Sequence, residues 1–189
     1  MEILKSSKGA LQKTVEAIKN GKIVVCPTDT VYGFLADASN KKAVDKIYKI
    51  KKRPKSKPLP VFVKNLKMAS EVAFINSKQS KTLKKLWPGR YTFILKRKPG
   101  MRLYGVHQKT IALRIPKYVF LQKLLKKINK PLSQTSVNIS GESVLDEIDD
   151  IIKQFGNQKI FIIDGGDIKK GKPSKIISLA GNTIKTLRL

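Results

Sequence analysis

The stretch Pro27-Thr28-Asp29-Thr30-Val31-Tyr32-Gly33 follows directly on the apolar run Ile23-Val24-Val25-Cys26. That run is short, rich in β-branched residues and bounded by Gly21 and Pro27, which predicts a buried strand. Polar groups directly after such a strand are well placed for function, because ligands in α/β sheets usually bind at strand ends. The stretch also fits an ordinary β-turn whose Thr and Asp side chains bond to the nearby backbone. Other parts of the chain must decide between these interpretations.

Outward from this stretch, helix and strand patterns alternate along the chain, which predicts an α/β protein. At 189 residues the simplest organisation is one domain, residues 1–189. Apolar residues at helical spacing predict helices over 7–20, 40–50, 65–72, 77–86, 118–128 and 146–156. The expected N-caps include Ser7, Asn40 and Asp146. Strands are expected over 23–26, 59–63, 91–95, 110–116, 160–163 and 176–179, with a terminal hairpin that turns at Gly181-Asn182.

The formal net charge is +27, and a field of that sign attracts nucleic acid or nucleotide phosphate. The excess is nearly all lysine scattered over every segment, so solvated faces explain it as well as an RNA surface does. Cys26 is the only cysteine, which excludes an internal disulfide, and it is expected to be a small buried residue. No apolar run approaches the length of about twenty residues that a membrane span needs. We therefore expect a cytoplasmic protein without a membrane partner.

Two groups of cations indicate anion binding. Residues 51–59 read Lys-Lys-Arg-Pro-Lys-Ser-Lys-Pro-Leu, and five cations in a short loop repel one another unless an anion lies among them. A solvated basic loop is the alternative. Arg114 stands inside an apolar strand pattern, where an unpaired guanidinium is costly, so it must meet a protein carboxylate or a substrate carboxylate.

The stretch Pro131 to Gly141 is rich in hydroxyl and amide side chains, which suits either a polar ligand or a turn that satisfies its own backbone. Residues 166–174 read G-x-x-x-x-G-K-P-S, close to a phosphate-binding P-loop. Pro173 stands where the magnesium-binding Ser or Thr should begin a helix, and a strand pattern follows, so we reject a P-loop.

The set of motifs along the whole chain resembles the YrdC-like threonylcarbamoyl-AMP synthases. The fragments, in order, are Pro27-Thr-Asp-Thr-Val-Tyr-Gly33, Lys51-x-Arg53-Pro54 with Pro58-Leu59, Trp87-Pro88-Gly89-x-x-Thr92, Arg114-x-Pro116, Ser136-x-Asn138-x-Ser140-Gly141 and a Gly-Gly before Ser174. Each fragment alone is weak, but six in this order and spacing are specific. The chain is similar to the short, single-domain form, which implies a twisted mixed β-sheet flanked by helices.

The resemblance implies that L-threonine, bicarbonate and ATP give threonylcarbamoyl-adenylate and pyrophosphate. Magnesium is expected with the triphosphate, and no metal site made by the protein itself is expected. Downstream threonylcarbamoyl-transferase proteins would pass the group to the adenosine beside the tRNA anticodon, and tRNA itself is a possible direct partner. The alternative is a non-catalytic paralogue of the same fold that binds double-stranded RNA or tRNA.

Site residues follow from the resemblance by position. It implies an L-threonine pocket made by Thr30, Arg114, Gln134 (through its backbone) and Ser174. It implies ATP binding by Lys51, Arg53, Lys57, Thr110, Ser136, Asn138 and Arg188. No side chain is assigned as the catalytic group, and the role of Asp29 stays open. Phe62, Lys175 and Arg90-Tyr91 depart from the common family pattern.

Overall fold

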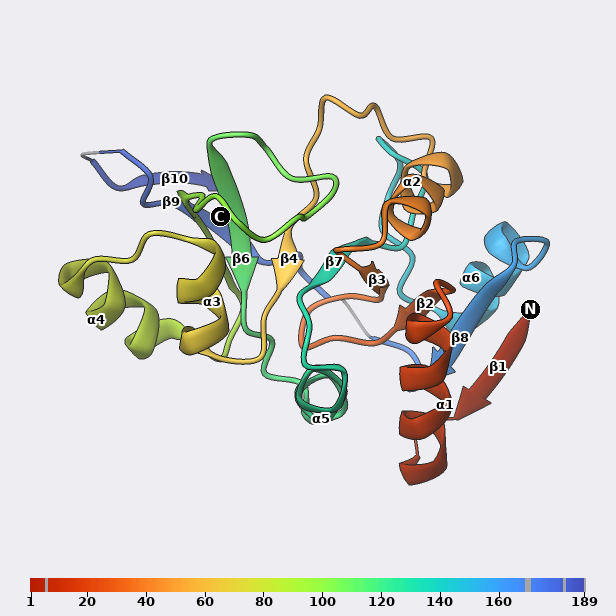
Figure 1. The fold of residues 1–189 in the computed structure, drawn as a ribbon. Helices are drawn as coiled ribbons and strands as arrows, with labels where there is room; N and C mark the ends of the chain where they lie inside the picture. Colours follow the sequence, from red (N-terminus) through yellow and green to blue (C-terminus); the bar gives the residue numbers. More distant parts are fainter. Residues whose placement is uncertain (6, 169–170, 182, 189) are drawn as a thin grey trace.

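The strands of the protein form one mixed β-sheet. The computed structural model describes residues 1–189 except for residues 6, 169–170, 182 and 189. Its ten-stranded sheet has the order β1-β8-β2-β3-β7-β4-β6-β5-β9-β10 (Figure 1). The strands are β1 Glu2–Lys5, β2 Ile23–Cys26, β3 Gly33–Asp37, β4 Val61–Phe62, β5 Tyr91–Lys96, β6 Thr110–Arg114, β7 Leu132–Ser136, β8 Ile160–Asp164, β9 Lys175–Ser178 and β10 Lys185–Arg188. The helices are α1 Lys8–Lys19, α2 Lys41–Ile50, α3 Leu66–Val72, α4 Ser77–Leu86, α5 Val119–Ile128 and α6 Ile148–Phe155.

The predicted α/β class with a mixed sheet and flanking helices is confirmed. Ser7 and Asn40 act as N-caps, since their side chains accept hydrogen bonds from the backbone N–H groups of Ala10 and Ala43. The predicted cap Asp146 is wrong. Helix α6 begins at Ile148 after Glu147, which makes no side-chain capping bond.

Three strands were not predicted from the sequence: β1, β3 and β7. Strand β3 runs antiparallel to β2 and pairs Gly33 with Cys26, so the opening stretch is the connection of a β-hairpin. The first half of the hydroxyl-rich stretch is also not a turn, because Leu132–Ser136 forms the central strand β7 between β3 and β4. The terminal hairpin of β9 and β10 is confirmed, although Asn182 in its predicted turn lies outside the described residues.

Both faces of the sheet are covered around β2 and β3. Val24, Cys26 and Leu35 pack with helices α1 and α5, while Val25 and Phe34 pack with α2 and α6 on the opposite face. A strand buried on both faces reads as a continuous apolar run, which explains the pattern before Pro27. Cys26 is fully buried, as predicted.

A separate apolar cluster joins α3 and α4 to β5 and β6. In Figure 1 these elements form one side of the molecule, and β1, β8 and α1 form the other. Strands β7 and β4 bridge the two sides. No helix in the described part of the chain is both long and apolar enough to cross a membrane.

Candidate active site

The turn between β2 and β3 is held by Thr28. Its hydroxyl accepts hydrogen bonds from the backbone N–H groups of Thr30 and Val31, at 2.9 and 3.1 Å, and donates to the Val31 carbonyl at 2.7 Å. This is the self-satisfied turn that the sequence allowed. The Thr30 hydroxyl also lies 2.8 Å from that of Thr28, and the side chains of Asp29 and Thr30 both accept hydrogen bonds from Arg114.

Arg114 lies at the end of β6 and is only 1% exposed. Its Nη2 donates to Asp29 Oδ1 at 2.6 Å, its Nη1 to Thr30 Oγ1 at 3.0 Å, and its Nε to the Gly89 carbonyl at 3.0 Å. Burial lowers the pKa of Arg114, and the Asp29 carboxylate opposes that shift. The sequence predicted that Arg114 must meet an anion, and the structure identifies Asp29 as that anion.

The guanidinium of Arg114 retains binding capacity. Arginine has five N–H donors, and the three bonds above use one on each nitrogen. One N–H on each terminal nitrogen therefore has no acceptor among the described residues. Phe62 lies under the guanidinium, 5.6 Å from its central carbon to the ring centroid, and covers one face of it.

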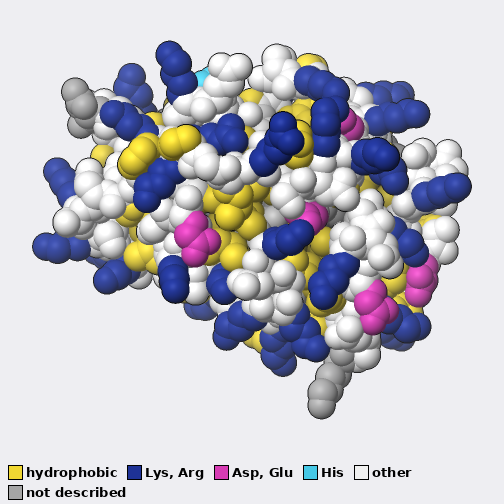
Figure 2. All heavy atoms as spheres, viewed as in Figure 1, with side chains coloured by type: hydrophobic (Ala, Val, Ile, Leu, Met, Phe, Trp, Pro, Cys, Tyr) yellow, Lys and Arg dark blue, Asp and Glu magenta, His cyan; other side chains and the backbone are white. Residues whose placement is uncertain are grey.

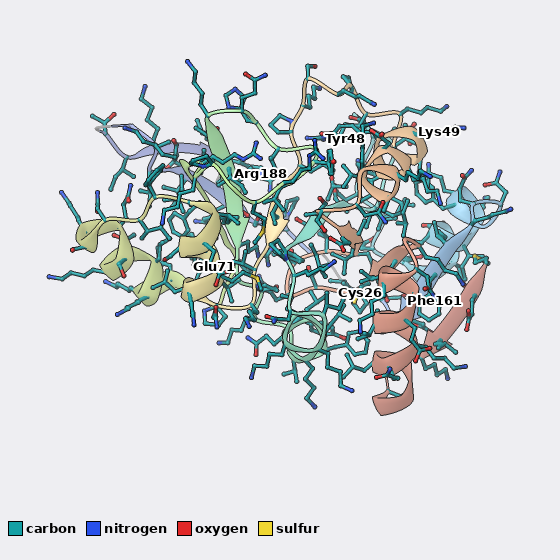
Figure 3. The ribbon with its side chains drawn as sticks, in the orientation of Figure 1. Cys26, Tyr48, Lys49, Glu71, Phe161 and Arg188 are labelled. Carbon is teal, nitrogen blue, oxygen red and sulfur yellow. The ribbon has the colours of Figure 1, made fainter. Side chains whose placement is uncertain are left out.

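Ser174 and Arg188 form the next part of the site. Arg188 donates to the Ser174 carbonyl from Nε at 2.9 Å and from Nη2 at 2.6 Å, while the Ser174 hydroxyl lies 2.8 Å from that of Thr92. In Figures 1 and 3 the end of β10 with Arg188 lies toward the other strands of the sheet, and the residue itself is exposed. Burial lowers the pKa of Arg188, and so does the nearby charge of Arg114. The two guanidinium groups of Arg114 and Arg188 with the one carboxylate of Asp29 leave an excess of positive charge, which suits an anionic ligand.

The loop after β8 passes close over the turn of Thr30. A Cβ added to Gly171 would lie 2.2 Å from the Thr30 carbonyl oxygen, so only glycine fits at this crossing. The crossing leads the chain directly to Ser174 and β9. The predicted pocket members Thr30, Arg114 and Ser174 are thus brought to one region by three separate elements.

Lys51 forms a second buried centre. It is 1% exposed, and its Nζ donates to the Ser136 carbonyl at 2.6 Å and to both the carbonyl and Oδ1 of Asn138 at 2.8 Å. Burial, with a smaller effect from Arg53, lowers the Lys51 pKa to about 7. All three ammonium hydrogens have protein acceptors. The direct ATP contact predicted for Lys51 stays a prediction, and it requires one of these bonds to be exchanged.

Ser136 and Asn138 form one network with Lys51. The Ser136 hydroxyl donates to Asn138 Oδ1 at 2.8 Å, and the Asn138 amide donates to the carbonyls of Ile139 and Glu142. The loop after β7 is therefore rigidly positioned by its own side chains and by Lys51.

The basic loop is shaped by Arg53, which donates to the carbonyls of Lys57 and Pro58 at 3.0 Å. Burial lowers the pKa of Arg53. Lys55 pairs with Asp45 at 2.9 Å, and Lys51 turns inward, so the crowding expected from sequence is partly relieved by the protein itself. Lys57 is exposed.

Thr110 and Gln134 are predicted site residues that, in the described part of the chain, make no hydrogen bond to the Arg114 centre or to the Lys51 centre. Thr110 begins β6 and contacts His107 at 3.2 Å, so it is separated from Arg114 by the length of the strand, about 13 Å. Gln134 lies in β7, and its backbone N–H donates to the Pro60 carbonyl at 2.9 Å, which leaves no backbone donor for a ligand there.

A cavity of about 660 Å³ opens beside the Arg114 centre. Its lining includes Asp29, Gly89, Arg90, Pro173 and Lys175. A larger cavity of about 720 Å³ lies between α1 and α5, but it contains none of the polar clusters described above. Asp29, Thr92 and Gly171 are the functional neighbours that the sequence left unassigned.

A model of the family described as Sua5_yciO_yrdC, telomere recombination, matches residues 16–189. The chain belongs to this family. A Methanocaldococcus jannaschii protein with the provisional name threonylcarbamoyl-AMP synthase is 39% identical over 181 residues, which is 96% of this chain and 86% of that protein.

Solved structures of Sua5/YciO/YrdC relatives have the same fold. Pyrococcus abyssi Sua5 complexed with L-threonine superimposes with a TM-score of 0.89 and 28% identity, covering 99% of this chain and 56% of that one. Escherichia coli YciO superimposes with a TM-score of 0.87 and 27% identity, covering 99% of this chain and 92% of that one. The curated Escherichia coli YciO sequence is named an uncharacterized protein. This chain thus spans little more than half of Sua5 and nearly all of YciO.

Proposed function

We propose that this chain is a threonylcarbamoyl-AMP synthase and that residues 1–189 carry the activity as one domain. The single observation that supports this most is the buried Arg114 centre, where Asp29 and Thr30 hold a guanidinium with two N–H donors that have no acceptor in the described part of the chain. A guanidinium of this kind matches the carboxylate of an amino acid. Relatives named threonylcarbamoyl-AMP synthase and a Sua5 complex with L-threonine support the same reaction.

The reaction joins three substrates. After the threonine ammonium loses a proton to solvent, its amine and bicarbonate form a carbamate and water, and a carbamate oxygen then attacks the α-phosphorus of ATP, from which pyrophosphate leaves. This chemistry depends on positioning and charge neutralisation more than on a side-chain nucleophile. Arg114, Thr30 and Ser174 would hold threonine, while Arg53, Lys57, Arg188 and the rigid loop of Ser136 and Asn138 would hold ATP.

Magnesium would enter with the triphosphate, held by phosphate oxygens and water. Among the described residues there is no group of three or more His, Cys, Asp or Glu side chains that could hold a metal ion. Bicarbonate would bind between the threonine amine and the α-phosphate. Downstream proteins would then transfer the threonylcarbamoyl group to tRNA.

The deciding experiment measures pyrophosphate release by the purified chain with ATP, bicarbonate, L-threonine and magnesium. We expect release that depends on threonine and on bicarbonate. No release under these conditions, with a relative of known activity as positive control, would contradict the proposal.

RNA binding is the second candidate, and the charge of +27 favours it. Figure 2 shows Lys and Arg side chains spread over most of the visible face rather than gathered in one patch. A non-catalytic RNA-binding protein would bind tRNA with a steep salt dependence and release no pyrophosphate. A salt slope near zero would contradict direct tRNA binding.

A further inference from the structure

One carboxylate oxygen beside the candidate threonine pocket has no partner. Among the described residues only two buried side-chain polar atoms lack a hydrogen bond, Asp29 Oδ2 and Ser133 Oγ. A buried carboxylate oxygen without a donor costs free energy, so native structures rarely keep one without a reason. The atom itself is buried, and the side chain to which it belongs is 13% exposed and lines the 660 Å³ cavity beside Arg114.

We propose that Asp29 Oδ2 binds the α-ammonium group of the amino-acid substrate. The inference rests on the proposed function, and it assigns Asp29 the task of selecting an amino acid over a carboxylic acid without the amine. An ammonium group supplies three N–H donors and a positive charge, which is what an unpaired carboxylate oxygen requires.

The orientation of this oxygen is fixed before a ligand arrives. Asp29 Oδ1 receives the 2.6 Å bond from Arg114 Nη2, and the second terminal nitrogen of Arg114 is held by Thr30. The Arg114 guanidinium is itself held in place by Gly89. A carboxylate oriented through one oxygen in this way presents its other oxygen in a constant direction, and such preorganisation reduces the entropic cost of binding.

The bonding pattern argues against a purely structural role for Asp29. Arginine and carboxylate commonly pair through two parallel bonds, which satisfy both oxygens. Here Arg114 donates to Asp29 from Nη2 alone and to Thr30 from Nη1, and Asp29 Oδ2 has no donor among the described residues. A residue that only neutralised Arg114 would gain stability from the second bond.

The charges also match the ligand. Arg114 and Asp29 form a neutral pair with a positive and a negative end. Threonine at neutral pH is a zwitterion, so its carboxylate matches the free N–H donors of Arg114 and its ammonium matches Asp29 Oδ2. Asp29 is the only carboxylate among the residues that line this cavity, where cations such as Arg90 and Lys175 would repel an ammonium group.

The test compares two ligands that differ only in the amine, L-threonine and (R)-3-hydroxybutanoate, by calorimetric titration of the full chain. We expect the wild-type chain to prefer threonine about 100-fold or more, because a site built for a polar group rejects an analogue without it. In Asp29→Asn the affinity for threonine should fall about 10- to 100-fold, and the affinity for (R)-3-hydroxybutanoate should stay within about three-fold.

The matched control is Asp45→Asn, which removes an acid that pairs with Lys41 and Lys55 in another part of the protein, and we expect it to change neither affinity.

If Asp29→Asn does not fold, Asp29→Glu keeps the charge but moves the oxygen by one methylene, and it should still lower threonine affinity selectively. Equal losses for both ligands would show that Asp29 acts only through Arg114, and no loss for threonine would show no role in binding; either result overturns the proposal. A wild-type chain that binds threonine but releases no pyrophosphate would contradict the proposed function while leaving this assignment intact.

Discussion

Arg114 and Lys51 are both 1% exposed, yet the protein surrounds the two cations differently. Arg114 meets a carboxylate, a hydroxyl and a carbonyl, while Lys51 meets two carbonyls and an amide oxygen. Neutral oxygens orient a buried ammonium but compensate its charge less than a carboxylate does.

The difference in partners indicates that the two cations have different roles, one in ligand binding and one in supporting a loop. At the Arg114 centre two N–H donors and one carboxylate oxygen have no partner among the residues that the structure describes, as a binding site needs. The Lys51 centre uses every donor it has, which makes it a support for the loop that carries Ser136 and Asn138. The following variants test this contrast, beginning with the largest expected effect.

Arg114→Ala should be the most damaging change, because it leaves the Asp29 carboxylate largely buried and unpaired. Loss of one partner of a buried pair costs about 3–5 kcal/mol, and threonine-dependent pyrophosphate release should disappear. Urea unfolding and the release assay measure the two effects. Arg114→Lys is the control that keeps the charge, and it should recover part of the stability. An unchanged unfolding midpoint in Arg114→Ala would contradict the role of the pair.

Lys51→Met should change how stability depends on pH. The pKa of Lys51 is about 7 in the folded protein against 10.5 ordinarily, so between these values the unfolded chain binds a proton that the folded chain does not. Wild-type stability should therefore rise relative to Lys51→Met as pH increases from 7 toward 10, by on the order of 1–3 kcal/mol. Below pH 7 the two curves should run parallel.

The matched control for this change is Lys49→Met, since Lys49 is exposed on α2, the helix that ends directly before Lys51 (Figure 3). It should show no such pH dependence. Parallel curves for wild type and Lys51→Met from pH 7 to pH 10 would mean that Lys51 remains charged in the folded state.

Arg53→Ala should affect ATP more than stability. Its side chain bonds to the carbonyls of Lys57 and Pro58 near the surface, and a charged contact to phosphate is worth about 1.5–3 kcal/mol. We expect the KM for ATP to rise about 10- to 100-fold, with an unfolding free energy within about 1 kcal/mol of wild type. Lys55→Ala in the same loop is the control, and an equal KM in both variants would remove Arg53 from the ATP site.

Ser174→Ala should have the smallest effect. It removes the contact with the Thr92 hydroxyl, worth about 1 kcal/mol, and should raise the KM for threonine a few-fold without changing that for ATP. Ser133→Ala is the contrasting variant, because the Ser133 hydroxyl is buried without a partner and its removal should leave stability equal or higher. Steady-state kinetics and thermal unfolding compare the two.

Most of the helices could be predicted from local patterns in the sequence. The caps at Ser7 and Asn40 were predictable, because a side-chain acceptor lies three residues before the backbone donor that it binds. Strand β7 was not, because Ser133, Gln134 and Thr135 are polar residues buried in the sheet. Strand patterns depend on what each face meets, and that is decided by distant elements.

The candidate site also has features that the sequence predicted and features that it could not predict. The sequence alone determined that an arginine in an apolar strand needs an anion, since the cost of burying a charge is a property of the residue and its pattern. Only the tertiary structure decided that Asp29, 85 positions away, is that anion, and that Lys51 turns inward to Asn138 instead of joining the basic loop. Such pairings depend on which strand ends the sheet places together, and no local periodicity encodes that placement.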